Sequence, residues 1–321
     1  MEQLLGHKER WIAPLVGYPA APLLGRNLKE LLTDPKLHAQ GILQLFKSFS
    51  PDIVFTLMDL SIEAQALGAQ ISLPLNDSPT VKTHPVKDLQ DVELLPLQGF
   101  FQRDRIKGYI EATSLLRNQV DVPLAAYVVG PFTLAGLLMG ASQIAMATIE
   151  QPELVVTLVS TVTELLAQYA RRLQDAGADL IVLLEPTATF LSPRSFQEFS
   201  GAWISRLLKV AQIKTLVLHI CGDTTRLLPA MEATGCHGLS LDAPVDFPKA
   251  SEVLQPQTWL IGNVNPVLFE TANPQQIERT TRELAQKMQH RKNFVLSTGC
   301  DLPLRAKPEN IEAFFRGGLP G

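Results

Sequence analysis

The chain has 321 residues, of which 46% are hydrophobic and 19% are charged, and its formal net charge is −4. This composition is typical of a globular protein with a large core and excludes a disordered or fibrous chain. Lysines and arginines are scattered singly, and no apolar stretch reaches the roughly 20 residues of a membrane-spanning helix. Because the segment from Met1 to Arg10 is polar rather than a signal peptide, we expect a cytoplasmic protein without nucleic-acid or membrane partners.

Short β-branched runs alternate with longer amphipathic segments along the chain, which is the pattern of repeated βα units and a parallel sheet. Eight such runs are predicted as strands: 12–16, 53–57, 124–129, 180–184, 215–218, 238–241, 259–261 and 294–296. Eight parallel strands close a barrel. We therefore predict an α/β protein, a single (β/α)8 TIM barrel with a helical N-terminal extension, and one domain over residues 1–321.

Helix start signals lie between these strands. A proline after a capping residue opens predicted helices at 35–49, 152–176, 193–211 and 274–288. Gly177 follows the long second one, as a C-terminal glycine does. A further apolar run at 69–75 is expected to pair as a hairpin outside the barrel.

Polar residues follow most of the predicted strands. They are Asp59 after the second strand, Glu185 after the fourth, His219 and Cys221 after the fifth, Asp242 after the sixth, Asn263 after the seventh, and Cys300 with Asp301 after the eighth. In a (β/α)8 barrel the active site is built at the C-terminal ends of the strands. These side chains are therefore expected to converge on one mouth.

His219, Cys221 and Cys300 form a candidate metal site, because two thiolates and one imidazole leave the fourth position of a tetrahedral zinc open for a substrate. The alternative is that all three are core residues, since cysteine is often buried and a histidine at a strand end is often only hydrogen-bonded. Three cysteines are too few for a disulfide framework. Cys236, which precedes a strand, is interpreted as a structural core residue.

The carboxylates at the strand ends have two interpretations. Asp223 and Asp301 precede predicted turns and could serve only as caps. Asp59 and Glu185 lie in apolar surroundings, so burying either is costly unless it binds a metal, a cation or a hydrogen-bond donor.

Six segments together resemble the uroporphyrinogen decarboxylase superfamily over nearly the whole chain. They are Asp59-Leu-Ser-Ile-Glu-Ala-Gln-Ala-Leu-Gly68, Gly130-Pro-Phe-Thr-Leu-Ala135, His219-x-Cys-Gly, Ile261-Gly-Asn-Val-Asn-Pro266, Thr298-Gly-Cys-Asp-Leu-Pro303 and Pro308-Glu-Asn-Ile311. Within it the chain is similar to the corrinoid-dependent branch, the methylcobamide:coenzyme M methyltransferases and their bacterial relatives. The resemblance implies a barrel, a zinc ion on His219, Cys221 and Cys300, and methyl transfer to a thiol from methylcobamide carried by a partner corrinoid protein.

The chain departs from the decarboxylase pattern at several positions. Those enzymes carry Arg-Gln-Ala-Gly-Arg after the first strand to hold substrate carboxylates, whereas this chain has Val16-Gly-Tyr-Pro-Ala20. Leu137 stands where they have a tyrosine, Cys300 stands where they have a histidine, and Asp59 is retained. A tetrapyrrole with many carboxylates needs cationic partners. Uroporphyrinogen decarboxylation is therefore the second choice.

The expected roles follow from the resemblance. Glu185 or Asp59 is catalytic, either as the fourth zinc ligand before substrate arrives or as acceptor of the thiol proton, and the sequence does not choose between them. Asp242 and Asn263 line the pocket, with Asn263 the better candidate to bond the polar tail of the acceptor. Tetrahydrofolate as acceptor and a non-catalytic corrinoid-protein-binding module remain alternatives, and an oligomer remains open.

Overall fold

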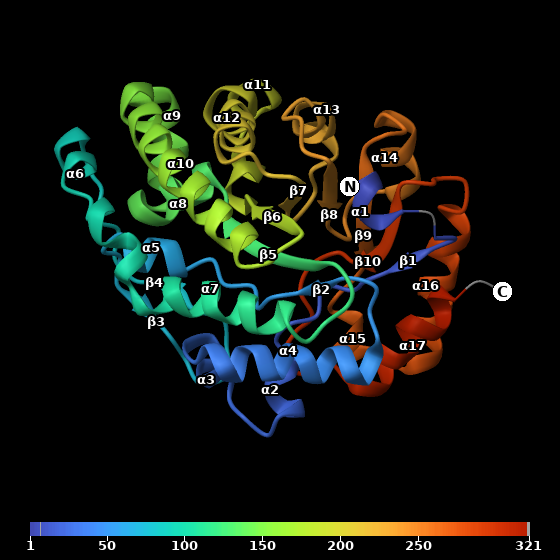
Figure 1. Ribbon diagram of the computed structural model, residues 1–321. Helices are drawn as coiled ribbons and strands as arrows, with labels where there is room; N and C mark the ends of the chain where they lie inside the picture. The colour runs from blue at the N-terminus through green and yellow to red at the C-terminus, as the bar shows by residue number, and fades with distance from the viewer. Residues whose placement is uncertain (7, 320–321) are drawn as a thin grey trace.

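The computed structural model describes residues 1–6 and 8–319. Eight parallel strands form one sheet, in the order β1-β10-β9-β8-β7-β6-β5-β2. Their bounds are β1 (Trp11–Ile12), β2 (Val54–Phe55), β5 (Leu124–Val129), β6 (Leu180–Leu184), β7 (Leu216–Ile220), β8 (Gly238–Leu241), β9 (Trp259–Val264) and β10 (Phe294–Thr298). The strands lie at the centre of the molecule and the helices lie outside them (Figure 1).

The two outermost strands of this sheet, β1 and β2, are linked through Asp52, which lies just before β2. The Asp52 backbone N–H donates to the carbonyl oxygen of Ile12 at 3.0 Å, and the Ile12 N–H donates to the Asp52 carboxylate at 2.8 Å. These bonds connect β1 to the segment that enters β2, and they complete the circuit of strands. The predicted (β/α)8 barrel is confirmed.

The strand bounds agree best with the sequence in the middle of the sheet. β5, β6 and β8 have the predicted bounds, whereas β7, β9 and β10 continue further than predicted, to Ile220, Val264 and Thr298. β1 and β2 are only two residues long each. Pro14 explains the short β1, because proline has no N–H for the ladder. The next N–H, that of Leu15, donates to the Thr298 side chain instead.

Most helices pack outside the strands. The shorter ones are α1 (Glu2–Leu5), α2 (Ala20–Leu23), α3 (Leu28–Thr33), α5 (Ile62–Ala66), α6 (Leu89–Glu93), α8 (Pro131–Met139), α11 (Pro193–Phe196), α13 (Leu228–Glu232), α14 (Phe247–Val253) and α15 (Leu268–Thr271). The longer ones are α4 (Pro35–Phe49), α7 (Asp104–Arg117), α9 (Ala141–Glu150), α10 (Pro152–Asp175), α12 (Ala202–Ala211), α16 (Pro274–Lys287) and α17 (Pro308–Gly318). Short 3-10 segments lie at 97–102, 186–190 and 225–227.

The four helices predicted from proline start signals are all present. α4 has the predicted bounds, and α10 and α16 end one residue before the predicted limit. Gly177, just beyond α10, has a φ of +109°, the backbone region that favours glycine. The segment predicted as one helix at 193–211 is instead interrupted by a π-helical turn at 197–201, between α11 and α12. The predicted hairpin is confirmed as the antiparallel pair β3 (Ile71–Ser72) and β4 (Thr80–Val81).

Two apolar layers hold the barrel together. The inner layer fills the barrel with one face of the strands, including Leu15, Phe55, Val217 and Val295. The outer layer joins the other face of the strands to the surrounding helices. Leu5 of α1 belongs to the inner layer, with Met1 and Leu4 packed against it, so the four-residue α1 covers the barrel near β8 and β9 (Figure 1).

No single helix within residues 1–6 and 8–319 is long and apolar enough to cross a membrane. α8 and α9 satisfy the length and hydropathy requirement only as a pair bent by 105°.

Candidate metal centre

Strand alternation brings His219 and Cys221 to the inside of the barrel. Val217 of β7 belongs to the inner apolar layer and Leu218 to the outer one. Because successive side chains of a strand point to opposite faces, His219 and Cys221 share the inward face with Val217. His219 lies within β7, where the predicted strand had already ended, and Cys221 follows its last residue.

Cys300 reaches the same place through a tight turn after β10. A Cβ atom on Gly299 would lie 2.6 Å from the Ala243 backbone nitrogen and 2.7 Å from an Asp242 carboxylate oxygen. Only glycine therefore lets the loop after β10 pass so closely against the loop after β8. This close passage carries Cys300 to the barrel axis.

The three predicted ligand atoms meet. His219 Nε2 lies 3.2 Å from Cys221 Sγ, Cys221 Sγ lies 3.4 Å from Cys300 Sγ, and Cys300 Sγ lies 3.6 Å from His219 Nε2. Bond lengths of about 2.0–2.3 Å to a tetrahedral zinc place its ligand atoms roughly 3.5–3.8 Å apart. The triangle is thus close to the size that a zinc ion requires, and these side chains fit the metal that the sequence predicted.

Neighbouring groups orient the His219 ring and shift the pKa of Cys300. His219 is buried, and its Nδ1 lies 2.9 Å from Ser240 Oγ, which fixes the ring with Nε2 toward the cysteines. Cys221 and Cys300 are free thiols and are partly exposed. The neighbouring Cys221 thiol and burial raise the pKa of Cys300 well above its usual value, whereas His219 lowers it. A cation bound between the sulfurs would reverse this preference for the protonated form.

Asp242 and Asn263, which the sequence predicted to line the pocket, line a cavity that reaches Cys300. The Asp242 carboxylate accepts hydrogen bonds from the Gly222 N–H at 2.7 Å and the Ala243 N–H at 2.6 Å. Gly222 directly follows a ligand cysteine, so Asp242 is held against the loop that carries it. Asp242, Asn263 and Cys300 line one cavity of about 800 Å³.

The structure places Glu185 at the start of α8 rather than in the triangle. Its carboxylate accepts hydrogen bonds from the Phe132 N–H at 2.9 Å, the Thr133 N–H at 2.8 Å and the Ser200 hydroxyl at 2.8 Å. Burial raises the pKa of Glu185, and these hydrogen bonds oppose the rise. Its backbone N–H donates to the carbonyl oxygen of His219 at 2.9 Å. Glu185 therefore joins α8 to the strand that carries a ligand.

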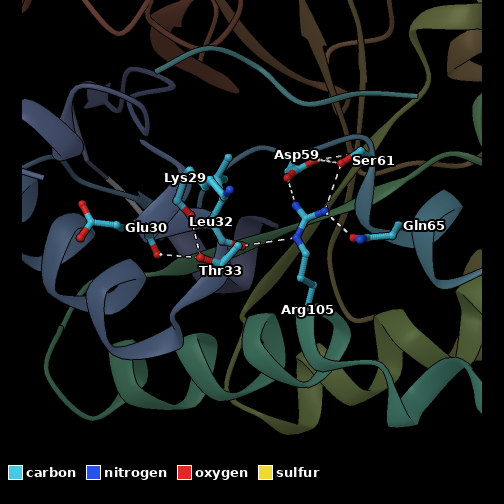
Figure 2. Close-up of polar contacts among 8 residues, drawn as sticks. All are labelled: Lys29, Glu30, Leu32, Thr33, Asp59, Ser61, Gln65 and Arg105. Carbon is cyan, nitrogen blue, oxygen red and sulfur yellow. Dashed lines mark hydrogen bonds and ion pairs between the residues drawn. The ribbon is translucent and has the colours of Figure 1, made fainter. Parts of the chain in front are cut away.

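Asp59 is paired with a cation. Arg105 of α7 forms an ion pair with the Asp59 carboxylate and donates to Ser61 Oγ, Gln65 Oε1 and the Leu32 carbonyl oxygen (Figure 2). Ser61 in turn donates to Asp59 from its N–H at 2.8 Å and its hydroxyl at 2.7 Å. The sequence required a cation or a hydrogen-bond donor for a buried Asp59, and the structure provides both: the Arg105 guanidinium and the N–H and hydroxyl of Ser61.

The remaining strand-end residues have local roles. Asp223 accepts from the N–H and hydroxyl of Thr225 in a local turn, and the helix that follows has Thr224 rather than Asp223 at its N-cap. Asp301 accepts from the Gly17 N–H at 2.8 Å and so ties the loop after β1 to the loop after β10. Burial raises the pKa of Asp301 to about 7. Cys236 is buried in the outer apolar layer, as predicted.

Sequence reasoning missed two polar partners. Ser240 precedes Asp242 by two residues, so strand alternation could have placed it on the inward face of β8, beside His219. Arg105 carries no comparable signal, because it lies on a helix 46 residues from its partner Asp59.

Comparisons with known proteins identify the family of this chain. The family model for uroporphyrinogen decarboxylase (URO-D) matches residues 15–317. The methylcobamide:CoM methyltransferase MtaA of Methanosarcina barkeri is 27% identical over 296 residues, which is 90% of this chain and 86% of that protein. A uroporphyrinogen decarboxylase of a Synechococcus strain is 28% identical over 307 residues, covering 91% and 85% of the two chains. A solved methyltransferase from Methanosarcina mazei superimposes with a TM-score of 0.89 at 26% identity, over 98% of this chain and 96% of that one.

Proposed function

The chain belongs to the uroporphyrinogen decarboxylase family, and on that premise we propose that it is a zinc-dependent methyltransferase. It would move a methyl group from a methylated corrinoid, carried by a partner protein, to a thiol. Overall identity does not choose between the activities in the family, since a methyltransferase and a decarboxylase are 27% and 28% identical to this chain. The observation that carries the proposal is the triangle of His219, Cys221 and Cys300, whose ligand atoms all lie within 4.8 Å of one another.

The mouth of the barrel argues against the decarboxylase. A substrate with many carboxylates needs cations that are free to bind it. The loop of residues 16–20 after β1 contains no Lys or Arg. Arg105, which lies close to the mouth, is already bound to Asp59 and to three further acceptors.

The ligand set suits a thiol substrate. Zinc bound here would lower the pKa of an incoming thiol and hold its sulfur as a thiolate. Cys221 and Cys300 bring two negative charges to the site, which favours a soft ligand and keeps a third sulfur electron-rich. Ser240 holds the His219 ring in place. These features match thiolate nucleophiles better than water activation, which neutral ligands support more strongly.

The reaction balances without a further reactant. The thiol loses its proton, and the sulfur electron pair forms the new carbon–sulfur bond. The carbon–cobalt bond of the corrinoid substrate would break with its electron pair left on cobalt, which takes Co(III) to Co(I). Asp242 lines the cavity that reaches Cys300 and has lone pairs beyond its two backbone bonds, so it is placed to accept the thiol proton.

Glu185 and Asp59 support the site in this proposal. Glu185 connects α8 to β7 through the Phe132, Thr133 and His219 backbones. Asp59 fixes the segment after β2 through Ser61 and Arg105. Their contacts favour positioning roles over the fourth zinc position that the sequence also allowed. We place the protein in the cytoplasm, where its three free thiols stay reduced.

The test is the visible spectrum of free methylcobalamin mixed with zinc-loaded protein and an excess of thiol. The proposal predicts thiol-dependent loss of the methyl–cobalt band. Cys300→Ala should abolish that loss, and Cys236→Ala should leave it unchanged. An unchanged spectrum with zinc bound would contradict the proposal; loss of the band with tetrahydrofolate instead of a thiol would change the acceptor.

A further inference from the structure

A cavity of about 800 Å³ opens from Cys300 toward the outside of the barrel. It lies between the loops that follow β8 and β9, and its outer wall is α16. Because Cys300 is one of the proposed zinc ligands, a molecule in this cavity can place its sulfur at the metal. The rest of the cavity would then surround the tail of that molecule.

The hydrogen bonds of Asn263 determine whether the tail should donate or accept a hydrogen bond. The side chain is 9% exposed and lines the cavity. Its Nδ2 donates to the carbonyl oxygens of Asp242 at 3.0 Å and Val245 at 2.8 Å, so both of its hydrogens are used. The opposite orientation of the amide would place its oxygen against those two carbonyls. Only Oδ1 is therefore left to meet a ligand, and Oδ1 accepts hydrogen bonds but cannot donate them.

The charged side chains that line the cavity also favour a tail that donates hydrogen bonds. Three carboxylates, those of Asp242, Asp246 and Glu283, line the cavity, against one cation, Lys287. Asp246 also forms an ion pair with Lys249, whose Nζ lies 3.2 Å from Asp246 Oδ2. A sulfonate or carboxylate tail would face more negative charge than positive charge here. An ammonium tail would instead be attracted by this excess of negative charge, and it could donate a hydrogen bond to Asn263 Oδ1.

We propose that this cavity selects the methyl acceptor, and that the acceptor is a thiol whose tail is an ammonium or another hydrogen-bond donor rather than an anion. This inference rests on the proposed function and names its substrate class. The tail takes no part in bond making: the thiol sulfur gains the methyl group and the amine is unchanged. Because Asp246 and Glu283 are exposed, salt screens their effect, and we expect a preference of about tenfold at low ionic strength.

The experiment compares three thiols that share a two-carbon spacer: cysteamine, 2-mercaptoethanol and 2-mercaptoethanesulfonate. Zinc-loaded protein is mixed with free methylcobalamin and each thiol, and kcat/KM for the thiol is measured from the methyl–cobalt band. Calorimetric titration of each thiol into zinc-loaded protein gives affinities that do not depend on turnover. We expect cysteamine to exceed the sulfonate about tenfold in both measurements, and added salt to narrow the ratio.

Variants separate the cavity from the intrinsic reactivity of the thiols. The double variant Asp246→Asn, Glu283→Gln removes two carboxylates, and the Asn retains the helix-capping oxygen at 246. We expect it to reduce the cysteamine-to-sulfonate ratio several-fold. The matched control, Asp121→Asn with Glu111→Gln, changes two exposed acids outside the cavity and should leave the ratio as in the wild type.

The outcomes are distinguishable. A sulfonate preference, or a ratio that the double variant does not change, overturns the inference and leaves the proposed function standing. Zinc-loaded protein that methylates none of the three thiols overturns the proposed function, and the inference that rests on it is lost as well.

Discussion

Two polar clusters lie at the C-terminal ends of the strands, and they differ in what their side chains lack. Asp59 has a cation and two hydrogen bonds from Ser61, so its charge is already balanced (Figure 2). His219, Cys221 and Cys300 have mainly one another, with two sulfurs 3.4 Å apart. The first cluster is complete without a ligand, whereas the second gains from a cation. Burial of polar groups therefore does not by itself mark a functional site, whereas buried polar groups that lack a cation or a hydrogen-bond partner do.

The largest difference between the clusters should appear when one metal ligand is removed. Cys300→Ala should weaken zinc binding by more than about a hundredfold, because even outer partners of metal ligands cost 10–100-fold. Global stability of the zinc-free protein should hardly change, since Cys300 is partly exposed. Zinc titration with a competing chelator measures the first effect and urea unfolding the second. Unchanged zinc affinity would show that Cys300 is not a metal ligand.

The Asp59 cluster should respond in the opposite manner. Arg105→Met leaves the buried Asp59 carboxylate without its cation and should lower the free energy of unfolding by about 3–5 kcal/mol. Zinc affinity per folded molecule should not change. Arg103→Met, an exposed neighbour, is the matched control. If Arg105→Met reduces zinc affinity as strongly as stability, the two clusters are one site.

Substitution of Glu185, which connects α8 to β7, should have a smaller effect on the free energy of unfolding. Glu185→Gln keeps the shape but turns one acceptor oxygen into a donor, which then faces either the Phe132 N–H and Ser200 hydroxyl or the Thr133 N–H. We expect a loss of about 1–3 kcal/mol in the free energy of unfolding, the usual cost of an unsatisfied buried donor. Urea unfolding at neutral pH checks this. A variant as stable as the wild type would show that the carboxylate is not needed at the start of α8.

The smallest expected effect is the change of stability with pH that comes from His38. His38 is buried on α4, accepts from the Leu57 N–H at 2.9 Å, and burial lowers its pKa from 6.5 to about 3. Between those pH values the unfolded chain binds a proton that the folded chain refuses, so stability falls as pH falls. The slope from this residue is at most about 1.4 kcal/mol per pH unit. Unfolding of the wild type and His38→Gln from pH 7 to pH 5 should show a steeper slope in the wild type, and equal slopes would contradict the assignment.

The sequence predicted that His219, Cys221 and Cys300 meet, but it did not predict that Arg105 pairs with Asp59. The reason is physical. His219 and Cys221 are two residues apart on one strand and Cys300 ends another, so barrel geometry alone brings them together. The partner of Asp59 lies on α7, and its identity depends on how that helix packs. Local patterns likewise placed β5, β6 and β8, whereas the two-residue β1 reflects Pro14 within a run that otherwise resembles a strand.

In the proposed site His219, Cys221 and Cys300 hold zinc and leave one position open for a thiol. Zinc-edge X-ray absorption of the zinc-loaded protein, before and after adding thiol, tests it most directly. We predict two sulfur ligands in the free protein and three in the presence of thiol, with one zinc per chain. A sulfur count that does not change on adding thiol, or a protein that binds no zinc, would contradict the claim.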